Sequence, residues 1–350
     1  MKKSLIALAV MAAAGAASAQ SSVTLFGIVD ATLQWGRGEV ADRFQLGNSG
    51  YNSSRLGFRG TEDLGGGMSA SFWLEAGMNN DNGTGGGSNT NNTAAGATVG
   101  QGLMFNRRST VSLAGNWGEL RLGRDYTPQF WNLTVFDPFG FNGVGTTQLA
   151  SVGGVVGPTA VRASNAIGYF LPARLGGFYG QVQYYTGEQP SNAVNDEDGD
   201  GLGLRIGFAQ GPFNVALGLS RTANAAGDIT QHNLGGQWDF GMARVMAQYA
   251  RDGNEGTNVD GRGWLIGALV PVGAGEIRVS YSRYLVEQAG PNPRTQKVAL
   301  GYVHNLSKRT AVYTTIATVR NRGAVTALNG STTGLGDSSS GLDIGIRHSF

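Results

Sequence analysis

The chain has 350 residues, no cysteine, 58 glycines and only 14% charged residues. The lack of cysteine excludes a disulfide framework and a thiolate metal site. Glycine in this amount suits a protein with many tight turns and closely curved strands.

Residues 1–19 have the pattern of a secretory signal peptide. Lys2 and Lys3 precede an apolar run from Leu5 to Ala14, and a small-residue cleavage site follows at residues 17–19. A buried first helix is the alternative. Removing the peptide takes two lysines and no acid, which leaves 24 basic residues against 24 acidic ones. The positive whole-chain charge is therefore a targeting signal and indicates no nucleic-acid partner. We predict that residues 20–350 form a single exported domain.

From Val23 onward the sequence falls into stretches of about ten residues with a two-residue hydrophobic period, which is typical of β-strands. In the first stretch, Val23, Leu25, Val29 and Leu33 fall on one face. Sixteen such strands are predicted, at residues 23–35, 53–61, 68–78, 105–115, 118–125, 162–171, 177–186, 201–209, 213–222, 230–240, 242–251, 262–270, 275–285, 295–304, 311–320 and 341–350.

The predicted connections alternate between short and long. Short turns are expected at residues 64–67, 116–117, 210–212, 241, 271–274 and 305–310, and long loops at 36–52, 79–104, 125–160, 187–200, 223–229, 252–261, 286–294 and 321–340. Long loops on one side only are typical of bacterial outer-membrane barrels, whose periplasmic turns are short.

The polarity of the strands favours a barrel that is apolar outside and polar inside. After the signal peptide, the sequence has no apolar run long enough to cross a bilayer as a helix. The polar strand faces consist mostly of Ser, Thr, Gly, Asn, Gln and Arg, which suits a water-filled lumen. We predict an all-β fold, a 16-stranded antiparallel transmembrane β-barrel wide enough for an aqueous channel.

Residues 125–160 are too long and too irregular for an ordinary turn. A structureless segment of this length inside a compact protein is either a wrongly assigned element or a functional loop. The segment contains Asp125, Asp137 and three prolines among six aromatic residues, so we expect a rigid third outer loop that folds into the lumen.

Four segments of the chain carry a family resemblance: SSVTLFGIVD (residues 21–30), SSRLGFRGTEDLGGG (53–67), FNRRSTVSLAGNWGELRLGRD (105–125) and GIRHSF (345–350). Together and in this order, they closely resemble the trimeric general porins of beta-proteobacterial and neisserial outer membranes. The resemblance implies a Gram-negative outer-membrane location among lipid, a homotrimer and a third loop in the lumen. It also implies a second loop that reaches over the neighbouring subunit, and a terminal aromatic, Phe350, that the barrel-assembly machinery reads.

An arginine cluster is the predicted pore constriction. Alternation places Arg55, Arg59, Arg108 and Arg162 on the lumen face near the third loop, and rings of arginine are the usual device of anion pores. The resemblance implies that Arg55, Arg108 and Arg162 match the family's pore-narrowing arginines. Asp137 is expected to face these arginines. The other predicted members are Asp125 at the constriction and Arg121, Glu75 and Glu119 on the pore wall.

The functional prediction is passive diffusion of small hydrophilic solutes and ions with a mild anion preference. No catalytic residues, cofactor or metal are expected: the three histidines show no visible catalytic pairing, and the acidic turn 196–200 lacks the carboxylate that ends a calcium loop. A channel selective for small organic anions or phosphorylated solutes is one alternative. A surface adhesin or barrel enzyme is another.

Overall fold

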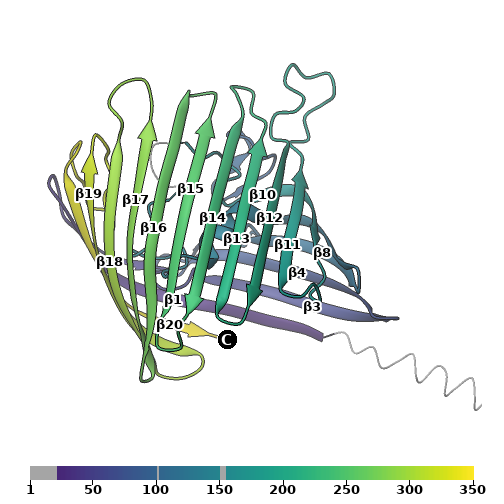
Figure 1. Ribbon diagram of the computed structural model, residues 1–350, viewed down its shortest axis with the longest axis horizontal. Coiled ribbons are helices and arrows are strands. Elements are labelled where there is room, and N and C mark those ends of the chain that lie inside the picture. Colours follow the sequence, from purple (N-terminus) through teal and green to yellow (C-terminus); the bar gives the residue numbers. More distant parts are fainter. Residues whose placement is uncertain (1–21, 101, 150–154) are drawn as a thin grey trace, which may run out of the picture.

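The computed structural model describes residues 22–100, 102–149 and 155–350. The predicted signal peptide, residues 1–19, lies outside this range. The described residues form one closed antiparallel barrel of sixteen strands, which confirms the predicted fold class (Figure 1). The strands of the wall are β1 (Ser22–Gly38), β3 (Arg55–Gly65), β4 (Met68–Asn79), β8 (Arg108–Gly115), β9 (Gly118–Tyr126), β10 (Arg162–Phe170), β11 (Phe178–Tyr185), β12 (Gly201–Gln210), β13 (Phe213–Thr222), β14 (Ile229–Asp239), β15 (Arg244–Asn254), β16 (Val259–Val272), β17 (Gly275–Glu287), β18 (Arg294–Asn305), β19 (Thr310–Arg322) and β20 (Ser338–Ser349).

The first and last strands close the barrel. β1 pairs with β20 from Ile28 opposite Ser349 to Gly38 opposite Ser339, and with β3 on its other side. The backbones of Gly27 and Phe350 exchange two hydrogen bonds of 3.1 Å, which extend this seam to the last residue. Closure leaves no free sheet edge among the wall strands that the structure describes. Figure 1 shows the C-terminus at the end of the barrel that carries the short turns.

The first outer connection is shorter than predicted. Residues 36–52 were expected to form a long loop, but β1 continues to Gly38 and a further strand, β2 (Arg43–Asn48), pairs with its outer half. The carboxylate of Asp30 organises the following turn, because it accepts hydrogen bonds from the backbone N–H groups of Tyr51 (2.9 Å) and Asn52 (2.6 Å). The two-residue period of Phe44 and Leu46, both exposed, is the sequence signal that the prediction missed.

The second outer loop folds back onto its own barrel. It contains three two-residue strands, β5 (Thr84–Gly85), β6 (Ser88–Asn89) and β7 (Ala97–Thr98). The buried side-chain amide of Asn92 donates to the carbonyls of Ser164 (3.1 Å) and Thr186 (3.0 Å), and its oxygen accepts from the N–H of Ser164. This loop therefore packs on the outer end of β10.

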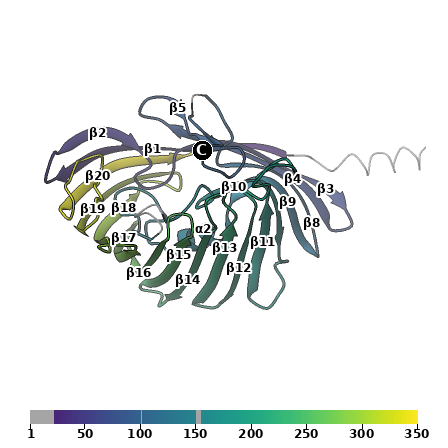
Figure 2. The same ribbon diagram turned by 90° about the horizontal axis from the view of Figure 1, so that it is seen from above.

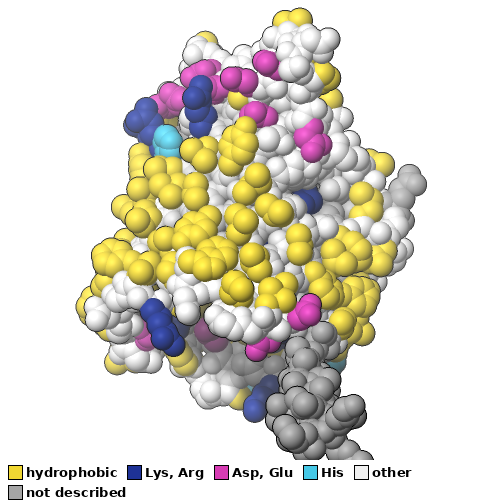
Figure 3. Space-filling view, turned by 90° about the vertical axis from the view of Figure 1, so that its right-hand side faces the viewer, with side chains coloured by type: hydrophobic (Ala, Val, Ile, Leu, Met, Phe, Trp, Pro, Cys, Tyr) yellow, Lys and Arg dark blue, Asp and Glu magenta, His cyan; other side chains and the backbone are white. Residues whose placement is uncertain are grey.

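The outer surface of the wall is apolar and the inner surface is polar. Exposed hydrophobic side chains alternate with buried polar ones along each strand, as with Val298 and Leu300 against Lys297 on β18. Figure 3 shows a broad band of hydrophobic side chains on one face of the barrel, with charged side chains above and below it. Among the described residues, no helix is long and apolar enough to cross a bilayer.

The third outer loop folds into the lumen, as predicted, but it is not structureless. It begins with a helix, α2 (Pro128–Val135), which lies inside the ring of strands in Figure 2 and contacts β11 to β14. Pro128 occupies the first turn, where its missing N–H costs nothing. The pair Thr127–Pro128 was the available sequence signal for a helix start.

Glycines on the inner face of the wall make room for this loop. A Cβ at Gly267 would lie 2.5 Å from Pro138, and one at Gly341 would lie 2.5 Å from Val144. The other inward glycines in close contact with the loop are Gly203, Gly218, Gly235, Gly263 and Gly301. Part of the high glycine content is thus explained by close approach of the loop to the wall.

Candidate functional site

A cavity of about 540 Å³ lies in the lumen between α2 and the wall formed by β3, β4 and β8 to β12. Its lining includes four arginines, two carboxylates and five aromatic rings. The charged members are Arg55, Arg108, Arg121, Arg205, Glu75 and Asp125, and the aromatic members are Trp73, Tyr126, Trp131, Phe170 and Tyr179. Of the nine residues predicted for the constriction and the adjoining pore wall, the structure therefore brings five to one place.

The carboxylate of Glu75 is shared by two guanidinium groups. Its Oε1 atom accepts from Nε of Arg107 at 2.6 Å and lies 3.4 Å from Nη1 of Arg55. Its Oε2 atom accepts from the indole N–H of Trp73 at 3.0 Å. Every oxygen of this buried carboxylate is used, as a buried charge requires. Glu75 thus fixes the positions of Arg55 on β3 and of Arg107, which directly precedes β8.

A second ion-pair network lies on β8 and β9. Arg121 contacts Asp125 at 2.6 Å and Glu119 at 2.9 Å, and the Asp125 carboxylate also lies 3.7 Å from Nε of Arg108. Residues 119, 121 and 125 are all odd-numbered positions of β9, so the two-residue period of the strand turns them toward the lumen together. The predicted pore-wall residues Glu119 and Arg121 lie in this network.

Aromatic rings support three of the four cavity arginines. The guanidinium carbons lie over ring centroids at 4.6 Å (Arg108 on Trp73), 3.9 Å (Arg121 on Phe170) and 4.8 Å (Arg205 on Tyr179). Such stacking holds a guanidinium in place while leaving its N–H edge free for anions. Arg205 also donates to the side-chain oxygen of Asn132 at 2.9 Å, which ties α2 to the wall.

Two predicted constriction arginines lie beside the cavity and do not line it. Arg59 is exposed, closer to the short-turn end than Arg55, and its guanidinium lies over Phe26 and Trp73. Arg162 stacks over the ring of Tyr126 at 4.3 Å and donates to the carbonyl of Arg107 at 2.9 Å. Arg162 therefore backs the cavity wall through Tyr126.

Asp137 does not face the arginine cluster as the sequence predicted. It is buried, and its carboxylate accepts from the backbone N–H groups of Phe139 (3.0 Å), Phe141 (3.0 Å) and Thr147 (3.3 Å) of its own loop. Burial raises the pKa of Asp137, although these N–H donors and the nearby Lys297 of β18 lower it. The geometric reason is that a tight loop tip turns this carboxylate inward to satisfy its own backbone.

The tip of the loop is fixed to the wall beside Asp137. The N–H of Val144 donates to Asp343 of β20 at 2.8 Å, and the N–H of Gln148 donates to Ser282 of β17 at 3.1 Å. The buried Lys297 interacts electrostatically with both Asp137 and Asp343. The acid that faces Arg108 in the structure is instead Asp125, at the base of the loop.

Two arginines, Arg205 in the cavity lining and Arg107 beside it, were not among the predicted site residues. Strand alternation along residues 105–115 places Arg108 on the lumen face and its neighbour Arg107 on the other, but β8 begins only at Arg108. Because Arg107 precedes the strand, the two-residue period does not fix its direction. The double arginine at positions 107 and 108 was the available signal.

The comparisons with known proteins agree with this geometry. Residues 5–324 match the family model described as Gram-negative porin. The chain is 40% identical to outer membrane porin protein 32 of Delftia acidovorans and 30% identical to an outer membrane porin protein of Bordetella pertussis, with all of both chains covered in each case.

The chain belongs to the Gram-negative porin family.

A solved structure of an anion-selective porin from Comamonas acidovorans matches this porin with a TM-score of 0.78 and 36% identity. The match covers 95% of this chain and all of the other. The protein is therefore an outer-membrane channel for passive diffusion and not an enzyme. The predicted family, location and class of function are confirmed.

Proposed function

We propose that this porin is a diffusion channel with a mild preference for anions, and that the cavity beside α2 is its constriction. The observation that carries the proposal is the charge of the cavity lining, four arginines against two carboxylates. Both carboxylates already form ion pairs with arginines, so the surplus positive charge is available to a passing anion. The similarity to the Comamonas porin, which is described as anion-selective, supports the same assignment.

The constriction residues in this proposal are Arg55, Arg108 and Asp125, with Arg121, Glu75 and Glu119 on the adjoining wall. Arg59 and Arg162 contribute positive charge from either side of the cavity. Asp137 contributes indirectly. Its hydrogen bonds to the backbone of its own loop hold the tip of the loop in its folded form.

We further propose that the mature protein, residues 20–350, is a single barrel domain that works as a homotrimer in outer-membrane lipid. The signal peptide, residues 1–19, directs export, and Phe350 is the signal for the barrel-assembly machinery. Phe350 suits this role because its backbone is hydrogen-bonded to Gly27 at the closure seam and its ring is exposed.

Planar-bilayer recording of the purified protein tests the proposal. A homotrimer predicts conductance that rises in groups of three equal steps. An anion preference predicts a reversal potential displaced toward the anion equilibrium potential in a salt gradient. A displacement toward the cation equilibrium potential would refute the role given to the arginines while leaving the porin assignment intact.

A channel selective for small organic anions or phosphorylated solutes is the second candidate. The five aromatic rings of the lining favour it, because arginines stacked on aromatic faces can bind planar carboxylates or phosphates. Saturable block of the current by one such solute at low concentration would distinguish this function from general diffusion.

A further inference from the structure

A row of arginines lies on the outward face of the barrel at the ends that carry the long loops. Each of these residues shares its strand face with exposed apolar side chains, as Arg262 does with Trp264 and Ile266. We call this set the arginine belt. Its members are Arg251 of β15, Arg262 of β16, Arg283 of β17, Arg294 of β18, and Arg320 and Arg322 of β19.

The strand register places like charges directly opposite each other in the belt. Arg251 is the cross-strand partner of Arg262, and Arg294 is the cross-strand partner of Arg322. Like charges in directly opposed positions destabilise a sheet. Two such pairs on one face concentrate positive charge that a negatively charged ligand would compensate.

The carboxylates of the protein compensate the belt only in part. On the outward face of β15 to β19 the acidic residues are Asp260 and Glu287, and Glu287 contacts Arg262 at 2.6 Å. Within residues 22–100, 102–149 and 155–350, none of the other five belt arginines has a carboxylate oxygen within 4.0 Å. The belt therefore carries six positive charges against two negative ones.

A surface cavity of about 430 Å³ lies within the belt. Arg283, Arg294 and Arg322 line it together with Leu285 and Pro291. Three guanidinium groups around one hollow form a site for a group with several oxygen atoms, because guanidinium binds phosphate through two parallel hydrogen bonds. Arg322 is exposed, while Arg283 and Arg294 are half-buried.

The height of the cavity on the barrel indicates which kind of phosphate-bearing molecule could reach it. Arg283 is the cross-strand partner of Trp264, an exposed aromatic residue of the apolar band. Tryptophan and tyrosine mark the level of the lipid headgroups in membrane proteins. The arginines thus lie at the headgroup level on the outer side of the membrane, with lipid chains beside them.

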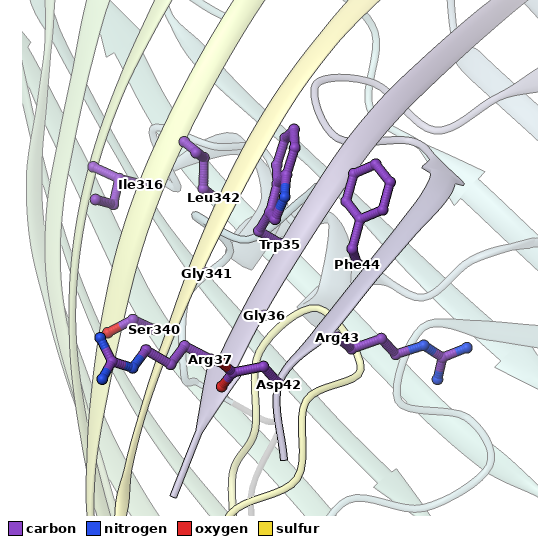
Figure 4. A pocket seen from close by; sticks show the side chains of 10 residues that line it. All are labelled: Trp35, Gly36, Arg37, Asp42, Arg43, Phe44, Ile316, Ser340, Gly341 and Leu342. Carbon is purple, nitrogen blue, oxygen red and sulfur yellow. The ribbon is translucent and has the colours of Figure 1, made fainter.

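The same combination of apolar and basic groups recurs across the closure seam. A groove of about 380 Å³ is lined by Trp35, Phe44 and Leu342 and by Arg37 and Arg43. Figure 4 shows the apolar side chains of this groove on one side and the charged ones on the other. Its one carboxylate, from Asp42, accepts a hydrogen bond from the N–H of Gly38 at 3.2 Å.

We propose that the arginine belt binds the phosphate groups of a phosphorylated lipid in the outer leaflet, with the lipid chains lying on the adjacent apolar band. The cavity between Arg283, Arg294 and Arg322 is the central phosphate site. Bound lipid phosphate removes the repulsion between the opposed arginine pairs and anchors the barrel at a fixed depth in the membrane.

Lipid binding to the folded protein in mild detergent tests this proposal, with native mass spectrometry to count bound lipids. The probes are lipopolysaccharide shortened to its lipid A and inner sugars, and the same lipid after removal of its phosphates. The variant R283Q/R294Q/R322Q removes three charges from the belt. The matched control R174Q/K308Q/R309Q removes three charges from exposed short turns at the opposite rim.

We expect the belt variant to bind the phosphorylated lipid about a hundredfold more weakly than the wild type. The control variant should bind like the wild type, and the dephosphorylated lipid should bind all three proteins equally weakly. Resistance to unfolding in dodecyl sulfate and unchanged conductance show that each variant is folded. The single variant R322E, at an exposed position, gives the same comparison if the triple variant does not fold.

Three results would overturn the proposal. The first is equal binding of the phosphorylated lipid by the belt and control variants. The second is displacement of the lipid by millimolar inorganic phosphate, which would indicate a site for the free ion. The third is loss of oligomers in the belt variant with unchanged lipid binding, which would assign this surface to contact between copies of the chain.

Discussion

Glu75 accepts a hydrogen bond of 2.6 Å from Arg107 while its same oxygen atom lies 3.4 Å from Arg55. One carboxylate of β4 therefore holds two arginines of the cavity region and neutralises part of their charge. The charge that a solute meets in the cavity therefore depends on the ion pairs of Glu75 as well as on the number of arginines.

Glu75→Gln should increase the anion preference of the channel. The substitution removes one negative charge from the cavity and leaves Arg55 and Arg107 without their shared partner. The measurement is the reversal potential in a salt gradient, compared with the wild type. Glu62→Gln is the matched control, because Glu62 is exposed on β3 close to a short turn. An equal reversal potential in Glu75→Gln and the control would show that Glu75 does not set the charge of the pathway.

Gly235→Leu should displace the third loop from the wall. The inner face of β14 at Gly235 is in direct contact with the ring of Phe136, so a larger side chain cannot fit without movement. Overpacking of this kind costs about 1–3 kcal/mol. We expect a lower melting temperature in detergent and noisier single-channel currents.

Gly236→Leu is the control for that experiment. Gly236 is the next residue of the same strand, and a Cβ there would lie at ordinary contact distances, 3.5 Å or more from its neighbours. Its side chain would point away from the lumen. If both variants melt and conduct alike, close packing of the loop against β14 is not what holds it in the lumen.

Asp137→Asn should alter the pH dependence of stability. Because burial raises the pKa of Asp137 in the folded protein, the fold favours the protonated acid. Its contribution to the free energy of unfolding is fully present below the pKa of the unfolded chain, about 4, and is lost as pH rises through the higher folded pKa. Asparagine does not titrate, so the variant lacks this loss.

The melting temperature of both proteins in detergent, followed from about pH 4 upward, measures this effect. The wild type should lose stability relative to Asp137→Asn as the pH rises. Two melting curves that run parallel over the whole range would mean that Asp137 titrates as it does in the unfolded chain.

The strand pattern could be predicted because its cause is local. Successive side chains of each strand face lipid and water in turn. The sequence positions of residues such as Val298 and Lys297 are therefore enough to assign them to the two faces. The lengths of the connections then indicate which end is outside. The alternation of the strands and the lengths of the connections are sufficient to predict the number of strands and the lumen positions of Arg55, Arg108 and Arg121.

The details of the loop could not be predicted, because they depend on contacts between distant residues. Asp137 turns away from the arginines because Phe139, Phe141 and Thr147 offer it three N–H groups, which no strand period reveals. Arg107 pairs with Glu75 although it lies outside β8, which begins one residue after it. Both positions follow from the closed structure and not from any local pattern.

The most direct test of the central claim is the reversal potential of the double variant R55Q/R108Q in a salt gradient across a planar bilayer. The control R174Q/R309Q loses the same charge from exposed short turns. If the cavity arginines set the selectivity, the wild type and the control give an anion-preferring potential, while the double variant moves toward zero or to the cation side. An anion preference in R55Q/R108Q equal to that of the control would contradict the claim.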